Sequence, residues 1–244
     1  VSAKKNINFK NNIIKSKNIK NFLNNFAKLK RNNCNSKIIA ITGSIGKTSL
    51  KNTLNILLQQ YGETFASPRS FNNHYGVPLS LSNLNYDTKF GIFEVGMSKL
   101  GEIDKLSKII NPNIAVITNI AEAHIENFKN LDGIARAKSE IINNIKKNGS
   151  LILNHDDKYY NFLKTKAESR KIKIVSFGKS KNSDVRLINI KEKKGTKKIT
   201  IKILKNIFDL KVKNINLFNV LAAFAVLKVL NLDLKKVLKI IKNL

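Results

Sequence analysis

The chain has 244 residues, of which 42% are hydrophobic, so it is long enough to bury one or two cores. It contains no apolar run that could span a membrane and no apolar signal core behind its first basic residues, and the single cysteine, Cys34, excludes an internal disulfide, so we expect a cytoplasmic protein. The net charge of +29 comes mainly from lysines scattered along every segment, without the arginines and interleaved aromatic residues of a nucleic-acid surface, so we expect no nucleic-acid partner.

The first 36 residues are predicted to form a polar lead-in that ends in one helix. Ser16 is a candidate N-cap for a helix over residues 17–31, and residues 32–36 break the helical pattern. Apolar side chains recur at helical spacing on one face of this segment: Ile19, Phe22, Leu23, Phe26 and Leu29.

Short apolar strands alternate with helices from residue 38 onward. The predicted strands cover residues 38–41, 63–66, 90–95, 114–118, 150–153 and 173–177. The predicted helices cover residues 47–60, 101–110, 131–146 and 158–169, with a short helix after Pro78. This alternation is typical of the α/β class and predicts a mainly parallel, doubly wound sheet, with ligands at the carboxyl ends of its strands.

The pattern changes after Gly178. Residues 185–190 and 197–204 alternate apolar and polar side chains around a turn at Lys194-Gly195-Thr196, which predicts a small antiparallel addition to the sheet. Residues 216–230 and 232–244 then predict two C-terminal helices.

The segment Gly43-Ser44-Ile45-Gly46-Lys47-Thr48 follows a predicted strand and opens a predicted helix. This order is typical of a phosphate-binding loop, in which backbone N–H groups and the helix N-terminus surround phosphate oxygens. The loop is shorter than the general pattern, because Ile41 stands where the first glycine usually lies. A chance Gly-Lys-Thr turn is the alternative, but the strand and the helix flank the loop in the right order.

We therefore predict an ATP site with Mg²⁺. Lys47 is expected to reach the β and γ phosphates, and the Thr48 hydroxyl is expected to bind Mg²⁺. The predicted ATP-binding residues of the loop are Gly43, Ser44, Ile45, Gly46, Lys47, Thr48 and Ser49.

Three residues outside the loop are further candidates. Glu94 lies at the end of a predicted strand, where a carboxylate can hold Mg²⁺, although an ordinary loop acid is the alternative. His124 follows the next strand and is expected at the same rim, with a structural histidine as the alternative. Lys138 has small alanines around it, but from composition alone it is one lysine among many.

Taken together, these motifs resemble the Mur ligases of peptidoglycan synthesis over about residues 38–244. The resemblance rests on four segments, in the same order and at similar spacing: residues 41–48, 94–97, 117–124 and 135–141. It implies an ATP-dependent amide ligase that forms an acyl phosphate. Residues 71–79, Phe-Asn-Asn-His-Tyr-Gly-Val-Pro-Leu, are similar to the members that join D-alanyl-D-alanine to UDP-N-acetylmuramoyl-tripeptide, so these two molecules are the expected partners.

The resemblance also implies roles for individual residues. Lys47 would stabilise the transferring phosphoryl group; Thr48 and Glu94 would hold one Mg²⁺, and His124 would help to hold a second. Lys138 matches the lysine that the family carbamylates with CO₂, which would place a carboxylate-like group at the metal site. The substrate-binding candidates are Asn72 and Asn73, and Asn219 matches a residue that approaches the adenine, although Ile215 stands where the family has a histidine.

The family's N-terminal and C-terminal domains have no counterpart in this sequence. We therefore expect residues 1–36 to be a lead-in from an N-terminal domain, residues 37–244 to be the central ATP-binding domain, and the chain to be a monomer with little or no ligase activity alone. Two alternatives stay open: another Mur-type amino-acid ligase, and a non-catalytic module that binds a nucleotide or a nucleic acid.

Overall fold

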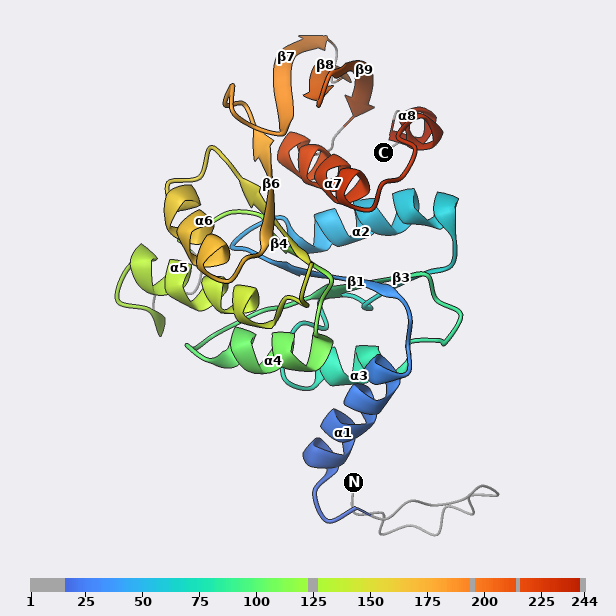
Figure 1. Ribbon diagram of the computed structural model, residues 1–244, viewed down its shortest axis with the longest axis vertical. Helices are drawn as coiled ribbons and strands as arrows, with labels where there is room; N and C mark the ends of the chain where they lie inside the picture. The colour runs from blue at the N-terminus through green and yellow to red at the C-terminus, as the bar shows by residue number, and fades with distance from the viewer. Residues whose placement is uncertain (1–15, 123–126, 194–195, 214–215, 242–244) are drawn as a thin grey trace.

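The computed structural model describes residues 16–122, 127–193, 196–213 and 216–241 (Figure 1). The nine strands of this described part form one sheet in the order β2-β3-β1-β4-β5-β6-β7-β8-β9. The strands are β1 (Lys37–Thr42), β2 (Thr64–Ala66), β3 (Phe90–Glu94), β4 (Ile114–Ile117), β5 (Ser150–Asn154), β6 (Lys173–Gly178), β7 (Val185–Lys193), β8 (Thr196–Ile203) and β9 (Asn206–Lys213). The α-helices are α1 (Ile19–Asn32), α2 (Lys47–Leu58), α3 (Gly76–Ser82), α4 (Glu102–Ile110), α5 (Leu131–Ser139), α6 (Tyr160–Ser169), α7 (Leu217–Val229) and α8 (Lys235–Ile241).

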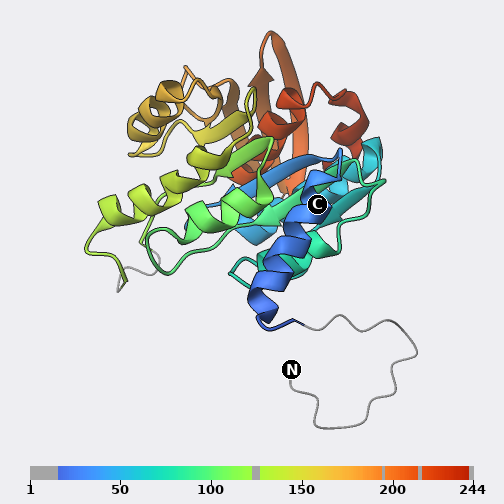
Figure 2. The ribbon, with the colours of Figure 1, turned by 60° about the horizontal axis from the view of Figure 1, so that its bottom comes forward.

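Strands β2, β3, β1, β4, β5 and β6 pair in parallel, which confirms the predicted doubly wound α/β sheet. Successive side chains of β1 point to opposite faces, so Ile39 and Ile41 enter one core while Ile38 and Ala40 enter the other. The first core packs under α2 and α7, and the second packs under α3, α4 and α5 (Figure 1 and Figure 2). Parallel pairing brings the carboxyl ends of β1, β3 and β4 to one edge of the sheet.

The antiparallel part is larger than the predicted hairpin. Strands β7, β8 and β9 form a three-stranded meander, and β7 joins the parallel sheet by pairing with the end of β6. Strand β9 was not predicted, because the turn before it consists of Leu204 and Lys205 and lacks the usual Asn-Gly or Gly signal. Leu204 itself adopts the left-handed conformation that such a turn requires, with φ of 57°.

The bounds of three helices differ from the prediction. The expected helix over residues 131–146 divides into α5 and a 3-10 segment, Glu140–Asn144. Helix α3 begins before Pro78, which lies in its first turn, where a missing N–H disrupts no intrahelical bond. Helix α7 matches the predicted one closely, whereas α8 is shorter in its described part, and residues 242–244 lie outside the described residues.

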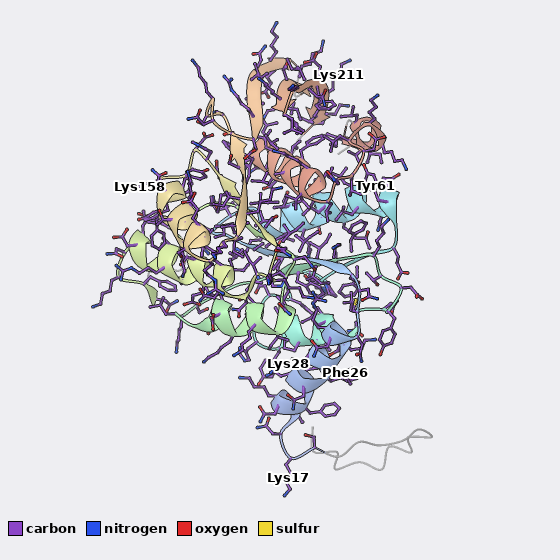
Figure 3. The ribbon with its side chains drawn as sticks, viewed as in Figure 1. Lys17, Phe26, Lys28, Tyr61, Lys158 and Lys211 are labelled. Atoms are coloured by element: carbon purple, nitrogen blue, oxygen red, sulfur yellow. The ribbon has the colours of Figure 1, made fainter. Side chains whose placement is uncertain are left out.

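Helix α1 is present as predicted, but Ser16 does not cap it. The cap is Asn18, whose side chain accepts a hydrogen bond from the Asn21 N–H at 2.9 Å. The predicted apolar face is largely exposed: Ile19 is 59% and Phe26 is 40% exposed, and Figure 3 shows the Phe26 ring beside α1, away from the body of the domain. None of the helices in the described part of the chain is long and apolar enough to cross a membrane.

Candidate active site

The loop between β1 and α2 wraps the end of the sheet in a conformation that needs glycine. Gly43 has φ of 148° and Gly46 has φ of 87°, and both values disfavour side chains. A Cβ on Gly43 would lie 1.9 Å from Thr118 Oγ1, so no side chain fits there. Gly46 is the N-cap of α2 and supplies no side-chain acceptor, so the first-turn N–H groups of α2 are available to an anion.

The first half of this loop is bound to the segment that follows β4. The Ser44 N–H donates to the Asn119 carbonyl at 3.1 Å, and the Ile45 N–H donates to Asn119 Oδ1 at 2.9 Å. The Ser44 hydroxyl donates to the Ala121 carbonyl at 2.7 Å. The amides of Ser44 and Ile45 are therefore engaged in this structure, and the predicted phosphate contacts fall to the amides at the start of α2. The sequence alone did not identify Asn119 as the residue that accepts these two hydrogen bonds from the loop.

Lys47 lies in the first turn of α2 and folds back over the loop. Its Nζ donates to the Gly43 carbonyl at 2.7 Å. Burial lowers the pKa of Lys47, and the negative charge of Glu94 opposes part of that change. The ammonium group thus lies where it can reach a phosphate held by the first turn of α2.

Glu94 ends β3 beside the loop and is fully buried. Its Oε2 accepts a hydrogen bond from the Thr48 hydroxyl at 3.2 Å, which brings the two predicted metal ligands together. Its Oε1 lies 3.0 Å from Lys51 Nζ in an ion pair that lacks hydrogen-bond geometry, so Oε1 has no hydrogen-bond donor among the described residues. Sequence reasoning did not single out Lys51.

His124, the other predicted metal ligand, lies outside the described residues. Within the described part of the chain, no group of three or more His, Cys, Asp or Glu side chains could hold a metal ion. The segment that leads to His124 is held in place at its start, because Asp157 Oδ2 accepts a hydrogen bond from the Ile120 N–H at 2.7 Å.

Lys138 lies near the end of α5 and is only 3% exposed. Burial, followed by the positive charge of Lys47, lowers the pKa of Lys138 to about 7. Two residues further on, the Glu140 carboxylate accepts hydrogen bonds from the N–H groups of Gly101 and Asp104, at 2.6 and 3.1 Å, at the start of α4. This contact holds the start of α4 against the end of α5. Lys138, on α5, and residues of α4 line the same cavity.

That cavity has a volume of about 410 Å³ and opens beside the loop. Residues from the loop, from the segment before α3, from α4 and from α5 line it: Gly43, Ser44, Lys47, Asn72, Asn73, His74, Gly96, Met97, Ser98, Glu102, Lys105, Leu106 and Lys138. The structure therefore brings Lys47 and Lys138 together with the two predicted substrate-binding asparagines.

Asn72 and Asn73 both line the cavity, and each also makes a contact that shapes it. The Asn72 carbonyl accepts a hydrogen bond from the Gly96 N–H at 2.8 Å, which fixes the loop against the end of β3. Asn73 Oδ1 accepts hydrogen bonds from the N–H groups of Tyr75 and Gly76 at 3.1 and 2.9 Å, so it organises the start of α3. The Nδ2 of Asn73 and the whole side-chain amide of Asn72 make no hydrogen bond to the described residues and are left for a ligand.

Asn219 approaches the loop from α7, on the other side. It is 3% exposed, and its Nδ2 donates to the Gly46 carbonyl at 3.3 Å. A second cavity, of about 430 Å³, lies here, and Lys47 and Asn72 line both cavities. Its lining residues are Ile45, Gly46, Lys47, Thr48, Ser49, Ser70, Asn72, Glu94, Asn216 and Asn219. The loop thus separates two adjoining spaces, one towards α7 and one towards α4.

Comparison with known proteins identifies relatives of this arrangement. The model of the Mur ligase middle domain matches residues 41–227. UDP-N-acetylmuramoyl-tripeptide–D-alanyl-D-alanine ligase of Rickettsia prowazekii (strain Madrid E) is 44% identical over 189 residues, which cover 77% of this chain and 42% of the relative. The enzyme of the same name from Bacillus subtilis (strain 168) is 36% identical over 191 residues, covering 78% of this chain and 40% of the relative. The chain thus spans about two fifths of the length of these relatives.

Solved structures show the same similarity. A crystal structure of MurF from Acinetobacter baumannii has a TM-score of 0.87 at 29% identity, covering 95% of this chain and 52% of that one. The MurF ligase from Thermotoga maritima in complex with ADP has a TM-score of 0.82 at 27% identity, covering 96% of this chain and 55% of that one. Both similarities extend across nearly the whole of this chain and about half of the solved one.

Proposed function

Because this chain belongs to the Mur ligase family, we propose that residues 37–244 are the ATP-binding middle domain of an amide ligase that acts in peptidoglycan precursor synthesis. Residues 1–36 would be the lead-in to this domain. The observation that carries the proposal is the convergence of Lys47, Glu94 and Lys138, from three different elements, around one loop at the carboxyl edge of the parallel sheet.

The proposed substrates follow from the names of the relatives and from the cavity on the α4 side. Several relatives are named for joining D-alanyl-D-alanine to UDP-N-acetylmuramoyl-tripeptide, and one is 44% identical to this chain. We assign the same reaction to the protein of which this domain forms part. The tripeptide's terminal carboxylate would enter the cavity that Lys47 and Lys138 line, where the positive charge of Lys47 suits an anion.

ATP is the proposed cofactor, with its phosphates at the first turn of α2 and its base towards Asn219. Support comes from the loop geometry and from the similarity to a MurF structure in complex with ADP. Lys47 would neutralise charge on the transferring phosphoryl group, and the first-turn amides would hold the phosphates. The acyl phosphate formed on the tripeptide would then be attacked by the amine of D-alanyl-D-alanine, releasing phosphate.

Mg²⁺ fits the residues around Glu94. The Thr48 hydroxyl lies 3.2 Å from Oε2 of the buried Glu94, so two oxygen ligands stand together beside the loop, while Oε1 is held by the Lys51 ammonium at 3.0 Å. Thr48 and Glu94 would hold the ion, with His124 as a further proposed ligand. The ion would neutralise charge on the phosphates as the phosphoryl group moves.

Lys138 fits the proposed carbamate. An amine must be neutral to attack CO₂, and a pKa of about 7 leaves much of Lys138 neutral at physiological pH. The neutral amine nitrogen would form a bond to the carbon of CO₂ and release one proton, which converts an uncharged group into an anion. That anion would line the same cavity as Lys47, and its oxygens could act as ligands of the proposed metal ion.

Nucleotide binding by the chain itself is the experiment that tests this function. Mg·ATP should raise the midpoint of thermal unfolding, because a ligand that binds only the folded state stabilises it. Lys47→Ala should remove most of that increase without changing the midpoint of the ligand-free chain greatly. The absence of any Mg·ATP stabilisation in the unaltered chain would contradict the proposed function. A cytoplasmic location and a monomeric state stay predictions.

A further inference from the structure

Lys51 is a buried cation that the proposed reaction does not use. It lies on α2, one turn after Lys47, and is only 2% exposed. Its ammonium group has two partners: Glu94 Oε1, at 3.0 Å, and the backbone carbonyl of Arg69, to which it donates a hydrogen bond. Burying an ammonium and a carboxylate together is costly, so both contacts are needed to hold Lys51 in this place.

The two partners of Lys51 belong to different parts of the site. Glu94 faces the nucleotide loop, because its other oxygen accepts the Thr48 hydrogen bond. Arg69 has φ of 45°, in the left-handed region, and begins the turn that leads to Asn72 and Asn73. Lys51 therefore joins the proposed metal ligand to the loop that carries the proposed substrate-binding residues.

A second set of contacts shows that these two parts lie against each other. The Ser67 hydroxyl accepts a hydrogen bond from the Glu94 N–H at 3.4 Å, and the Ser70 hydroxyl lies 3.4 Å from the Thr48 hydroxyl. Asn72 packs on Gly96, where an added Cβ would lie 2.8 Å from its Oδ1. A movement of the Glu94 carboxylate towards a bound ion would thus change the contacts of residues 67–72.

We propose that Lys51 is a positioning residue that couples metal-nucleotide binding at Glu94 to the conformation of residues 69–73. It orients the Glu94 carboxylate through Oε1 and fixes the loop through the Arg69 carbonyl. The inference rests on the proposed function, in which Glu94 holds Mg²⁺ beside ATP. It goes further, because it assigns a role to a residue that touches neither the nucleotide nor the substrate in that proposal.

Calorimetry of the chain with ADP, in Mg²⁺ and in EDTA, tests the first half of the proposal. In Lys51→Met, the gain in ADP affinity that Mg²⁺ produces should fall by about tenfold, because the ion would meet a misplaced carboxylate. The affinity measured in EDTA should change little. Lys228→Met is the matched control and should leave both affinities unchanged. Lys228, in the last turn of α7, forms a 2.8 Å ion pair with Asp184, which lies just before β7.

Hydrogen exchange tests the coupling itself. Mg·ADP should slow exchange of residues 69–74 in the unaltered chain, but not in Lys51→Met at saturating ligand, whereas the start of α2 should be protected in both. Equal protection of residues 69–74 in both proteins, or an unchanged Mg²⁺ effect on affinity, would overturn the proposal.

If Lys51→Met does not fold, Lys51→Gln, which keeps a hydrogen-bond donor without the charge, is tested with the same two measurements. If neither variant folds, Lys51 has a structural role and the proposal is rejected. Failure of the unaltered chain to bind Mg·ADP would instead count against the proposed function.

Discussion

Asn119 Oδ1 accepts a hydrogen bond from the Ile45 N–H at 2.9 Å, although the two residues are 74 positions apart in the chain. Together with the bond from the Ser44 N–H to the Asn119 carbonyl, this contact ties the nucleotide loop to the end of β4. The loop is therefore held in shape before any nucleotide arrives, which lowers the entropy lost on binding.

Asn119→Ala should loosen the loop. Loss of the side-chain acceptor should reduce the free energy of unfolding by about 1 kcal/mol, and a less ordered loop should bind ATP about fivefold more weakly. Urea denaturation and calorimetry measure the two effects. Asn161→Ala, at an exposed position of α6, is the control and should change neither quantity. Unchanged ATP affinity in Asn119→Ala would show that this hydrogen bond is not needed for binding.

Gly43→Ala should destabilise the domain more than an ordinary glycine substitution. The new Cβ would lie 1.9 Å from Thr118 Oγ1 at a φ of 148°, so we expect a loss of more than about 2 kcal/mol in the free energy of unfolding. Gly101→Ala is a suitable comparison, because its φ is also positive but no atom lies within 4 Å of the added Cβ. Equal losses in the two variants would mean that the Thr118 contact adds nothing.

Lys138 should give the domain a stability that rises with pH. Its pKa is about 7 in the folded chain and 10.5 in an unperturbed lysine, so between these values the unfolded chain binds more protons. The free energy of unfolding should therefore increase by roughly 1 kcal/mol per pH unit across this window, through this residue. In Lys138→Met, measured by urea denaturation in CO₂-free buffer, the rise should be flatter by that amount. Lys164→Met, at a partly exposed position, should retain the original slope, and a parallel curve for Lys138→Met would contradict the lowered pKa of Lys138.

Carbamylation of Lys138 should be visible without any ligase activity. In ¹³C-labelled bicarbonate, the chain should show a carbamate carbon signal by NMR that is absent from Lys138→Arg, because the guanidinium stays protonated. Lys105→Arg is the control, since Lys105 lines the same cavity. A carbamate signal that persists in Lys138→Arg would assign the modification to another amine.

The α/β fold was predictable because its parallel core consists of short apolar strands and periodic helices. Strand β9 was not predicted, since Leu204 and Lys205 make a turn with no glycine or asparagine to mark it. The division of the helix after Ser139 was also missed, and it coincides with Glu140 turning to cap α4. The division of the helix was decided by a contact with a distant segment rather than by local propensity, whereas β9 was missed because its turn carries no residue that marks it.

The site was predictable in part. Gly43, Lys47 and Glu94 follow strands, and parallel strands must bring their carboxyl ends to one edge, so their proximity could be inferred from order alone. Lys51 could not be singled out, because it is one of many lysines on a helix and its burial becomes evident only when Glu94 and Arg69 are placed beside it. Asn119 lies within the segment 117–124 that resembles the family, but its two bonds to the loop depend on the pairing of β1 with β4.

The order of residues along the chain was enough to predict the alternation of strands and helices, the phosphate loop and the family, because all of these depend on spacing between near neighbours. Folding alone settled which amides the loop keeps free, which lysine is buried against an acid and which has a lowered pKa. Those properties arise from burial and from contacts between segments that are far apart in the chain, and such contacts exist only after the sheet has assembled.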